Sequence, residues 1–90
     1  MKTIRVYISG TVQGVLYRKH LEEQGNKIGV RGFLRQNQDG RIEAVFEGTE
    51  NKVNQMLEVC KQGTKHATVR NVEVHEIKYQ GFEGFRISKL

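Results

Sequence analysis

The sequence predicts an α+β fold in which two helices cover one face of an antiparallel sheet. Three patterns in its 90 residues indicate this fold. Residues 3–9 alternate between polar and apolar side chains, residues 53–60 repeat apolar side chains at helical spacing, and Asp39-Gly40 marks a tight turn between two apolar runs. A chain of this length has the size of one small domain, so residues 1–90 are expected to fold as a single unit.

A strand and a helix are expected first. The strand ends at Gly10, and the apolar face that its alternation creates carries Ile4, Val6 and Ile8. The helix covers residues 18–29, is weakened by Gly25 and stops near Gly29. Its apolar stripe consists of Tyr17, Leu21 and Ile28.

A hairpin and a second helix follow. Residues 30–48 form two strands around Asp39-Gly40, a pair that tolerates the positive backbone angles of a tight turn. The core face of the second of these strands carries Ile42, Ala44 and Phe46. Thr49 is the expected N-cap of a helix that ends at Gly63, and its buried positions, which include the chain's one cysteine, are Val53, Met56, Leu57 and Cys60.

Residues 69–80 and 82–89 are expected to form two more strands. A phase change between Val74 and Ile77 indicates a β-bulge. The order is therefore strand, helix, strand, strand, helix, strand, with an extra C-terminal strand. This is the split pattern of a ferredoxin-like two-layer sandwich, an architecture that carries many different functions.

Composition limits the partners that the chain can take. The formal net charge of +5 attracts anions, although the cations are spread along the chain rather than gathered in one block. No apolar run approaches the roughly 20 residues that cross a bilayer, and the N-terminus has no signal-peptide pattern, so we expect a cytoplasmic protein without a membrane partner. The lone Cys60 and the scattered histidines indicate neither a disulfide, a metal site nor a cofactor.

The segment GTVQGVLYR, residues 10–18, joins the first strand to the first helix. Consecutive backbone N–H groups in such a turn can point at one anion, and the positive end of the helix dipole strengthens the site. Gly14 lets the backbone approach a ligand, and Arg18 offers a planar fork of donors to phosphate oxygens. No Walker motif follows, so this is not a nucleotide-hydrolysing loop of that type.

Two segments closely resemble the acylphosphatase family, small hydrolases of carboxyl-phosphate mixed anhydrides: ISGTVQGVLYR at residues 8–18 and GFLRQNQDGRIEAVFEG at residues 32–48. The resemblance extends over nearly the whole chain and implies the ferredoxin-like fold. In that family the loop binds phosphate through its amides and through the arginine that ends it, here Arg18. The resemblance implies hydrolysis of acyl phosphates to a carboxylate and inorganic phosphate, with no metal or cofactor.

Gln36 departs from the family pattern, which places there an asparagine that orients the attacking water. Asn37 follows one place later, where a strand residue faces the opposite side of the sheet. Glutamine carries the same amide about 1 Å farther out, and a displacement of about 1 Å can cost roughly 100-fold in rate. Two interpretations stay open: an acylphosphatase slowed by Gln36, or a catalytically weakened or inactive anion-binding module.

The resulting hypothesis names Arg18 and Gln36 as catalytic and assigns the phosphate to the loop amides of Gln13, Gly14, Val15, Leu16, Tyr17 and Arg18. The expected partners are a small acyl phosphate substrate, and phosphate or another inorganic anion in the loop. A monomer is expected. The segment RGFL at residues 31–34 matches the start of an RNA-binding element, but LRQNQ does not continue it, so no nucleic acid partner is expected.

Overall fold

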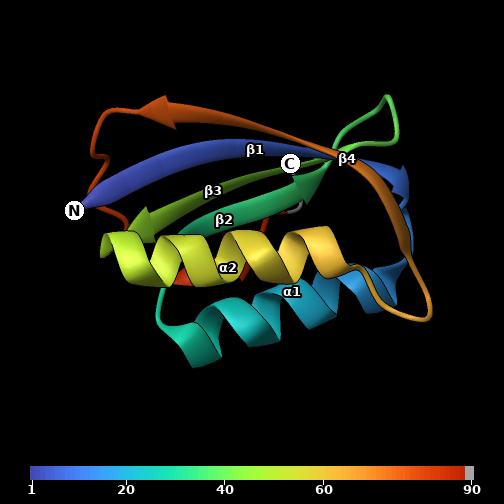
Figure 1. The fold of residues 1–90 in the computed structure, drawn as a ribbon, viewed down its shortest axis with the longest axis horizontal. Coiled ribbons are helices and arrows are strands. Elements are labelled where there is room, and N and C mark those ends of the chain that lie inside the picture. Colours follow the sequence, from blue (N-terminus) through green and yellow to red (C-terminus); the bar gives the residue numbers. More distant parts are fainter. Residues whose placement is uncertain (89–90) are drawn as a thin grey trace.

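A computed structural model describes residues 1–88 and shows a two-layer sandwich of one sheet and two helices (Figure 1). The sheet has five strands in the spatial order β4-β1-β3-β2-β5. Among these residues no helix combines the length and the apolar character needed to span a bilayer. In chain order the elements are β1 (Lys2–Thr11), α1 (Val15–Ile28), β2 (Arg31–Gln36), β3 (Ile42–Gly48), α2 (Glu50–Gln62), β4 (Thr68–Ile77) and β5 (Phe85–Ile87).

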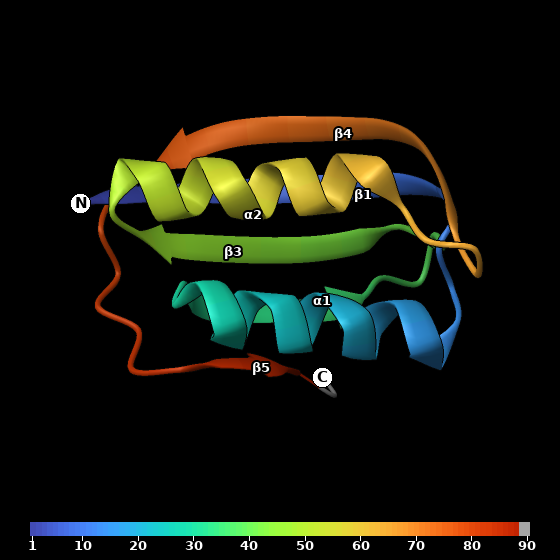
Figure 2. The same cartoon turned by 60° about the horizontal axis from the view of Figure 1, so that its bottom comes forward.

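Both helices lie on the same face of the sheet, as Figure 2 shows. Helix α1 packs on β2 and β5, while α2 packs on β1, β3 and β4. The core fills the space between the layers, and the predicted inward faces of β1, β3 and α2 are confirmed. Its buried members include Ile4, Val6, Ile8, Ile42, Ala44, Phe46, Val53, Met56 and Cys60, with Leu57 partly buried against them.

The predicted ends of the helices are also confirmed. The Thr49 hydroxyl accepts a hydrogen bond from the Lys52 N–H, which caps α2, and Gly63 follows its last residue. Gly29 adopts a left-handed conformation and its N–H donates to the Gly25 carbonyl, which closes α1. Helix α1 starts at Val15, three residues before the start expected from the sequence, because the chain becomes helical directly after the loop.

Gly25 is a packing contact between α1 and β5 rather than a weak point of the helix. A side chain at this buried position would overlap the ring of Phe85 in β5. The missing Cβ therefore lets the last strand approach α1 closely.

The predicted bulge between Val74 and Ile77 is wrong. Strand β4 pairs with β1 without interruption from Val72 to Ile77, and the irregularity lies instead opposite Ser9 and Gly10. Val74 pairs with Val6 on the helix side of the sheet, whereas Ile77 pairs with Thr3 on the open side. The phase change therefore reflects an edge strand with apolar side chains on both faces.

The extra C-terminal strand is confirmed, but it pairs in parallel with β2, whereas all other pairs are antiparallel. The chain leaves β4 at one edge, crosses to the opposite edge and turns back on the way, which gives β5 the direction of β2. The strand is shorter than the predicted range 82–89, of which Lys89 lies outside the described residues.

The buried Glu47 carboxylate at the end of β3 holds this crossover. It accepts hydrogen bonds from three consecutive backbone N–H groups, those of Gln80, Gly81 and Phe82, and from the Thr3 hydroxyl. Burial alone would raise the pKa of Glu47, but these donors together hold it below its usual range. The crossover in turn sets where β5 begins.

Candidate active site

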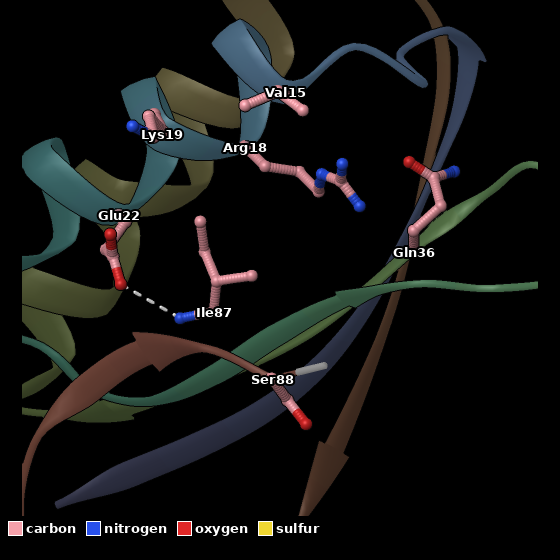
Figure 3. A pocket seen from close by; sticks show the side chains of 7 residues that line it. All are labelled: Val15, Arg18, Lys19, Glu22, Gln36, Ile87 and Ser88. Atoms are coloured by element: carbon pink, nitrogen blue, oxygen red, sulfur yellow. Dashed lines mark hydrogen bonds between the residues drawn. The ribbon is translucent and has the colours of Figure 1, made fainter. Parts of the chain in front are cut away.

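A cavity of about 620 Å³ lies where α1 begins and where β2 and β5 end (Figure 3). The crossover brings β5 to this place, so the walls come from segments far apart in the sequence. They are Val15, Arg18, Lys19 and Glu22 from α1, Gln36 from the end of β2, and Ile87 and Ser88 from the end of β5 and just beyond it.

The N-terminus of α1 is left open to an anion. Its N-cap residue is Gly14, no side chain caps it, and the first turn contains no acid. Helix α2 differs, since it is capped by Thr49 and begins with Glu50. The first N–H groups of a helix have no partner within it and carry the positive end of its dipole, so α1 presents uncompensated positive potential at the cavity.

The structure brings together some of the loop residues that the sequence singled out, and separates others. Val15 and Arg18 line the cavity, and Gln13 and Gly14 are exposed in the turn just before α1. The Leu16 side chain is 60% exposed and is not part of the cavity wall. The ring of Tyr17 is buried in the core, where its hydroxyl donates to the Cys60 carbonyl at 3.1 Å, so only the main chain of Tyr17 faces the loop side.

Arg18 points its guanidinium across the cavity toward Gln36 (Figure 3). It makes no ion pair with any residue between 1 and 88, whereas Arg5 and Arg35 are paired with Glu43 and Arg41 is paired with Asp39. Arg18 therefore offers an uncommitted set of donors to a ligand.

The Gln36 amide is held by the turn between β2 and β3. Its Nε2 donates to the Gly40 carbonyl at 2.8 Å and to the Arg41 carbonyl at 3.3 Å. Two carbonyl acceptors fix the nitrogen on this side of the amide, because a carbonyl accepts only from a donor. The other atom, Oε1, is buried and accepts no hydrogen bond from any residue between 1 and 88.

The turn that holds Gln36 is itself tightly bonded. Asp39 accepts from the Arg41 N–H at 3.0 Å and from Arg41 Nε at 2.8 Å. The Asn37 N–H donates to the Arg41 carbonyl, and the Asn37 carbonyl accepts from the Gly40 N–H. Asn37 belongs to the turn and does not line the cavity, so Gln36 is the amide side chain that faces Arg18.

Four wall residues were not singled out as site residues in the sequence: Lys19, Glu22, Ile87 and Ser88. The Oε2 atom of Glu22 accepts a hydrogen bond from the Ile87 N–H at 3.0 Å and fixes the end of β5 against α1. Its spacing of four residues from Arg18 places both on one helix face, which is the signal that could have identified it. Ile87 reaches the cavity only through the crossover, which no local pattern indicates.

Comparison with known proteins gives one consistent result. Residues 4–87 match the family model described as Acylphosphatase. An acylphosphatase of Syntrophus aciditrophicus is 43% identical over 88 residues, which cover 97% of this chain and 92% of the relative. An acylphosphatase of Haloquadratum walsbyi is 44% identical over 84 residues, covering 93% and 90%. The crystal structure of acylphosphatase from Bacillus subtilis superposes with a TM-score of 0.93 at 30% identity, covering 98% of this chain and 99% of that one.

Proposed function

This chain belongs to the acylphosphatase family and hydrolyses acyl phosphates, and we propose that Arg18 and Gln36 are its catalytic residues. One observation carries the proposal: the guanidinium of Arg18, which has no ion-pair partner among residues 1–88, and the uncapped N-terminus of α1 adjoin one cavity, directly across from the Gln36 amide. Positive charge and a water-binding group thus lie on two sides of a space that can hold a phosphoryl group.

The phosphoryl group is held by the loop before α1. Backbone N–H groups from Gln13 to Tyr17 bind its oxygens, because the Arg18 N–H already donates to the Gly14 carbonyl. The guanidinium fork of Arg18 binds two of the oxygens. Phosphoryl transfer passes through a loose transition state with charge spread over three equatorial oxygens, so catalysis requires mainly positioning and charge stabilisation. The leaving group is a carboxylate, which departs without a strong acid.

The attacking water is held by the Gln36 Oε1 atom, which is buried in this structure and is reached by water once the side chain shifts slightly toward the cavity. A water that donates a hydrogen to this oxygen keeps a lone pair free to attack phosphorus. Because Nε2 already donates to Gly40 and Arg41, the amide has no donor left for the water or the phosphoryl oxygens. Gln36 therefore supports turnover at a lower rate than an amide with free donors.

The test is steady-state hydrolysis of benzoyl phosphate without added metal, with inorganic phosphate as competitive inhibitor. Arg18→Ala is expected to lower kcat/KM roughly 1000-fold and to weaken inhibition by phosphate. The matched control is Arg31→Ala, which removes an exposed arginine at the far end of β2 and should leave both values unchanged. An Arg18→Ala variant that keeps its rate and phosphate inhibition would contradict the proposal.

We also propose that residues 1–90 act as a single cytoplasmic domain and as a monomer. The edge strands support the monomer, because β5 has three residues and β4 exposes Arg70, Glu73 and Glu76. Short edges and charged side chains both disfavour pairing between the sheets of two molecules. The free, buried Cys60 suits a reducing compartment. Size-exclusion chromatography with light scattering tests the oligomeric state, and a dimer mass would refute it.

A further inference from the structure

The cavity at the start of α1 has more room than a phosphoryl group occupies. Its volume of about 620 Å³ lies within the range of roughly 300–1,000 Å³ found for pockets that enclose small organic ligands. Arg18 lies in the middle of its wall (Figure 3). Gln36 is on one side of Arg18, and Lys19 and Glu22 are on the other.

The direction of attack determines which side takes the acyl group. In phosphoryl transfer the attacking and leaving oxygens lie roughly in line with phosphorus. If the water is at Gln36, the leaving carboxylate points away from Gln36. From Arg18 that direction leads between Val15 on α1 and Ile87 on β5.

We propose that the acyl group of the substrate lies between Val15 and Ile87, and that Ile87 selects acyl phosphates whose acyl group has an apolar body, either aliphatic or aromatic. This inference rests on the proposed roles of Arg18 and Gln36. The non-reacting part of the substrate would then contact β5, the last strand of the sheet.

The chemistry of this part of the cavity is apolar. Val15 is 55% exposed and Ile87 is partly buried, and both line the cavity, so each presents methyl groups to it. The Ile87 N–H is already bonded to Glu22, which leaves β5 with a hydrocarbon contact here rather than a hydrogen-bond donor. Lys19 and Glu22 have opposite charges and lie one turn apart, so they favour neither a cationic nor an anionic acyl group.

The experiment compares kcat/KM for benzoyl phosphate and for acetyl phosphate. Ile87→Ala is expected to lower the value for benzoyl phosphate roughly tenfold while changing that for acetyl phosphate less than about twofold, because only the larger acyl group reaches Ile87. Inhibition by inorganic phosphate should not change. Ile28→Ala removes another partly buried isoleucine, at the opposite end of α1, and should leave the benzoyl-to-acetyl ratio unchanged.

The outcomes separate this inference from the proposed function. If Arg18→Ala abolishes hydrolysis of both substrates but Ile87→Ala lowers both equally, Ile87 is only structural and the inference fails alone. Native protein that hydrolyses neither substrate overturns the proposed function itself. If Ile87→Ala does not fold, Ile87→Val gives the answer: a selective loss of roughly threefold for benzoyl phosphate supports the inference, and an unchanged ratio overturns it.

Discussion

Gln36→Asn is expected to make the enzyme faster and its fold less stable. The Nε2 atom lies 2.8 Å from the Gly40 carbonyl and 3.3 Å from the Arg41 carbonyl. Removing one methylene withdraws the amide by about 1 Å or more, since a C–C bond is about 1.5 Å long. Both distances then exceed hydrogen-bonding range. The amide hydrogens become free to bind the water and the phosphoryl oxygens.

The size of both effects follows from the bonds exchanged. A well-placed hydrogen-bond donor is worth about 100- to 1000-fold in rate. Because Oε1 already positions the water in part, kcat should rise by less than this, roughly 10- to 100-fold. Two lost hydrogen bonds cost about 1–2 kcal/mol of unfolding free energy. In a domain of this size that lowers Tm by roughly 5–10 °C.

The assay is benzoyl phosphate hydrolysis combined with thermal unfolding. Gln38→Asn is the matched control, because Gln38 is exposed in the same turn, and it should change neither value. Gln36→Met keeps the length of glutamine without an amide, and should lower kcat while leaving phosphate inhibition intact. An asparagine variant that is no faster would show that the glutamine amide is already productively placed. An unchanged Tm would show that the bonds to Gly40 and Arg41 contribute nothing in solution.

Three further changes test the scaffold. Glu47→Gln should lower the free energy of unfolding by roughly 2–4 kcal/mol at neutral pH. Hydrogen bonds hold the pKa of the Glu47 carboxyl below its usual range. Its stabilisation is therefore fully present above the usual titration range of glutamate and is lost as pH falls through the lower pKa of the folded state. Urea unfolding should therefore show a smaller difference from the native protein at about pH 3 than at about pH 7, and a constant difference would contradict this. Gly25→Ala should lower the free energy of unfolding by roughly 1–3 kcal/mol despite the higher helix propensity of alanine, and by less when Phe85 is also replaced by leucine. A Gly25→Ala variant that is more stable in urea than the native protein would disprove the contact. Tyr17→Phe removes the hydrogen bond to the Cys60 carbonyl and should lower the free energy of unfolding by about 1 kcal/mol without changing kcat. A large fall in kcat would instead place the Tyr17 side chain in the site.

Local signals in the sequence predicted most of the fold. Thr49 and Gly63 mark the ends of α2 by chemistry that needs no tertiary context. The alternation of β1 indicated which of its faces is buried, because one shift of register would expose the whole set. The tight turn expected at Asp39-Gly40 is instead a longer connection over residues 37–41, since Gln36 pairs with Ile42 and only Gly40 adopts a positive φ. The bulge predicted in β4 was wrong because it assumed that every apolar side chain of an edge strand faces the helices.

The site was harder to predict, because its geometry depends on partners distant in sequence or in the main chain. The resemblance to a known family led to the hypothesis that Arg18 and Gln36 are catalytic, but no pattern reveals that carbonyls of the following turn use both donors of Gln36. Ile87 enters the cavity because Glu47 binds the crossover and Gly25 admits Phe85. These contacts join segments that are distant in the sequence, and the periodicity within one segment does not predict its contacts with another.

The crossover held by Glu47 also has a consequence for the order of folding. Glu47 and the backbone groups that it binds are separated by 33 to 35 residues along the chain. Contacts between distant segments form slowly, because the chain must be closed into a loop before they yield any stabilisation. Strand β5 has three residues and pairs with β2 at one edge of the sheet, so we expect it to dock after the hairpin and helices are in place. We therefore expect the loop before α1 to form during refolding before the cavity wall that contains Ile87 is complete.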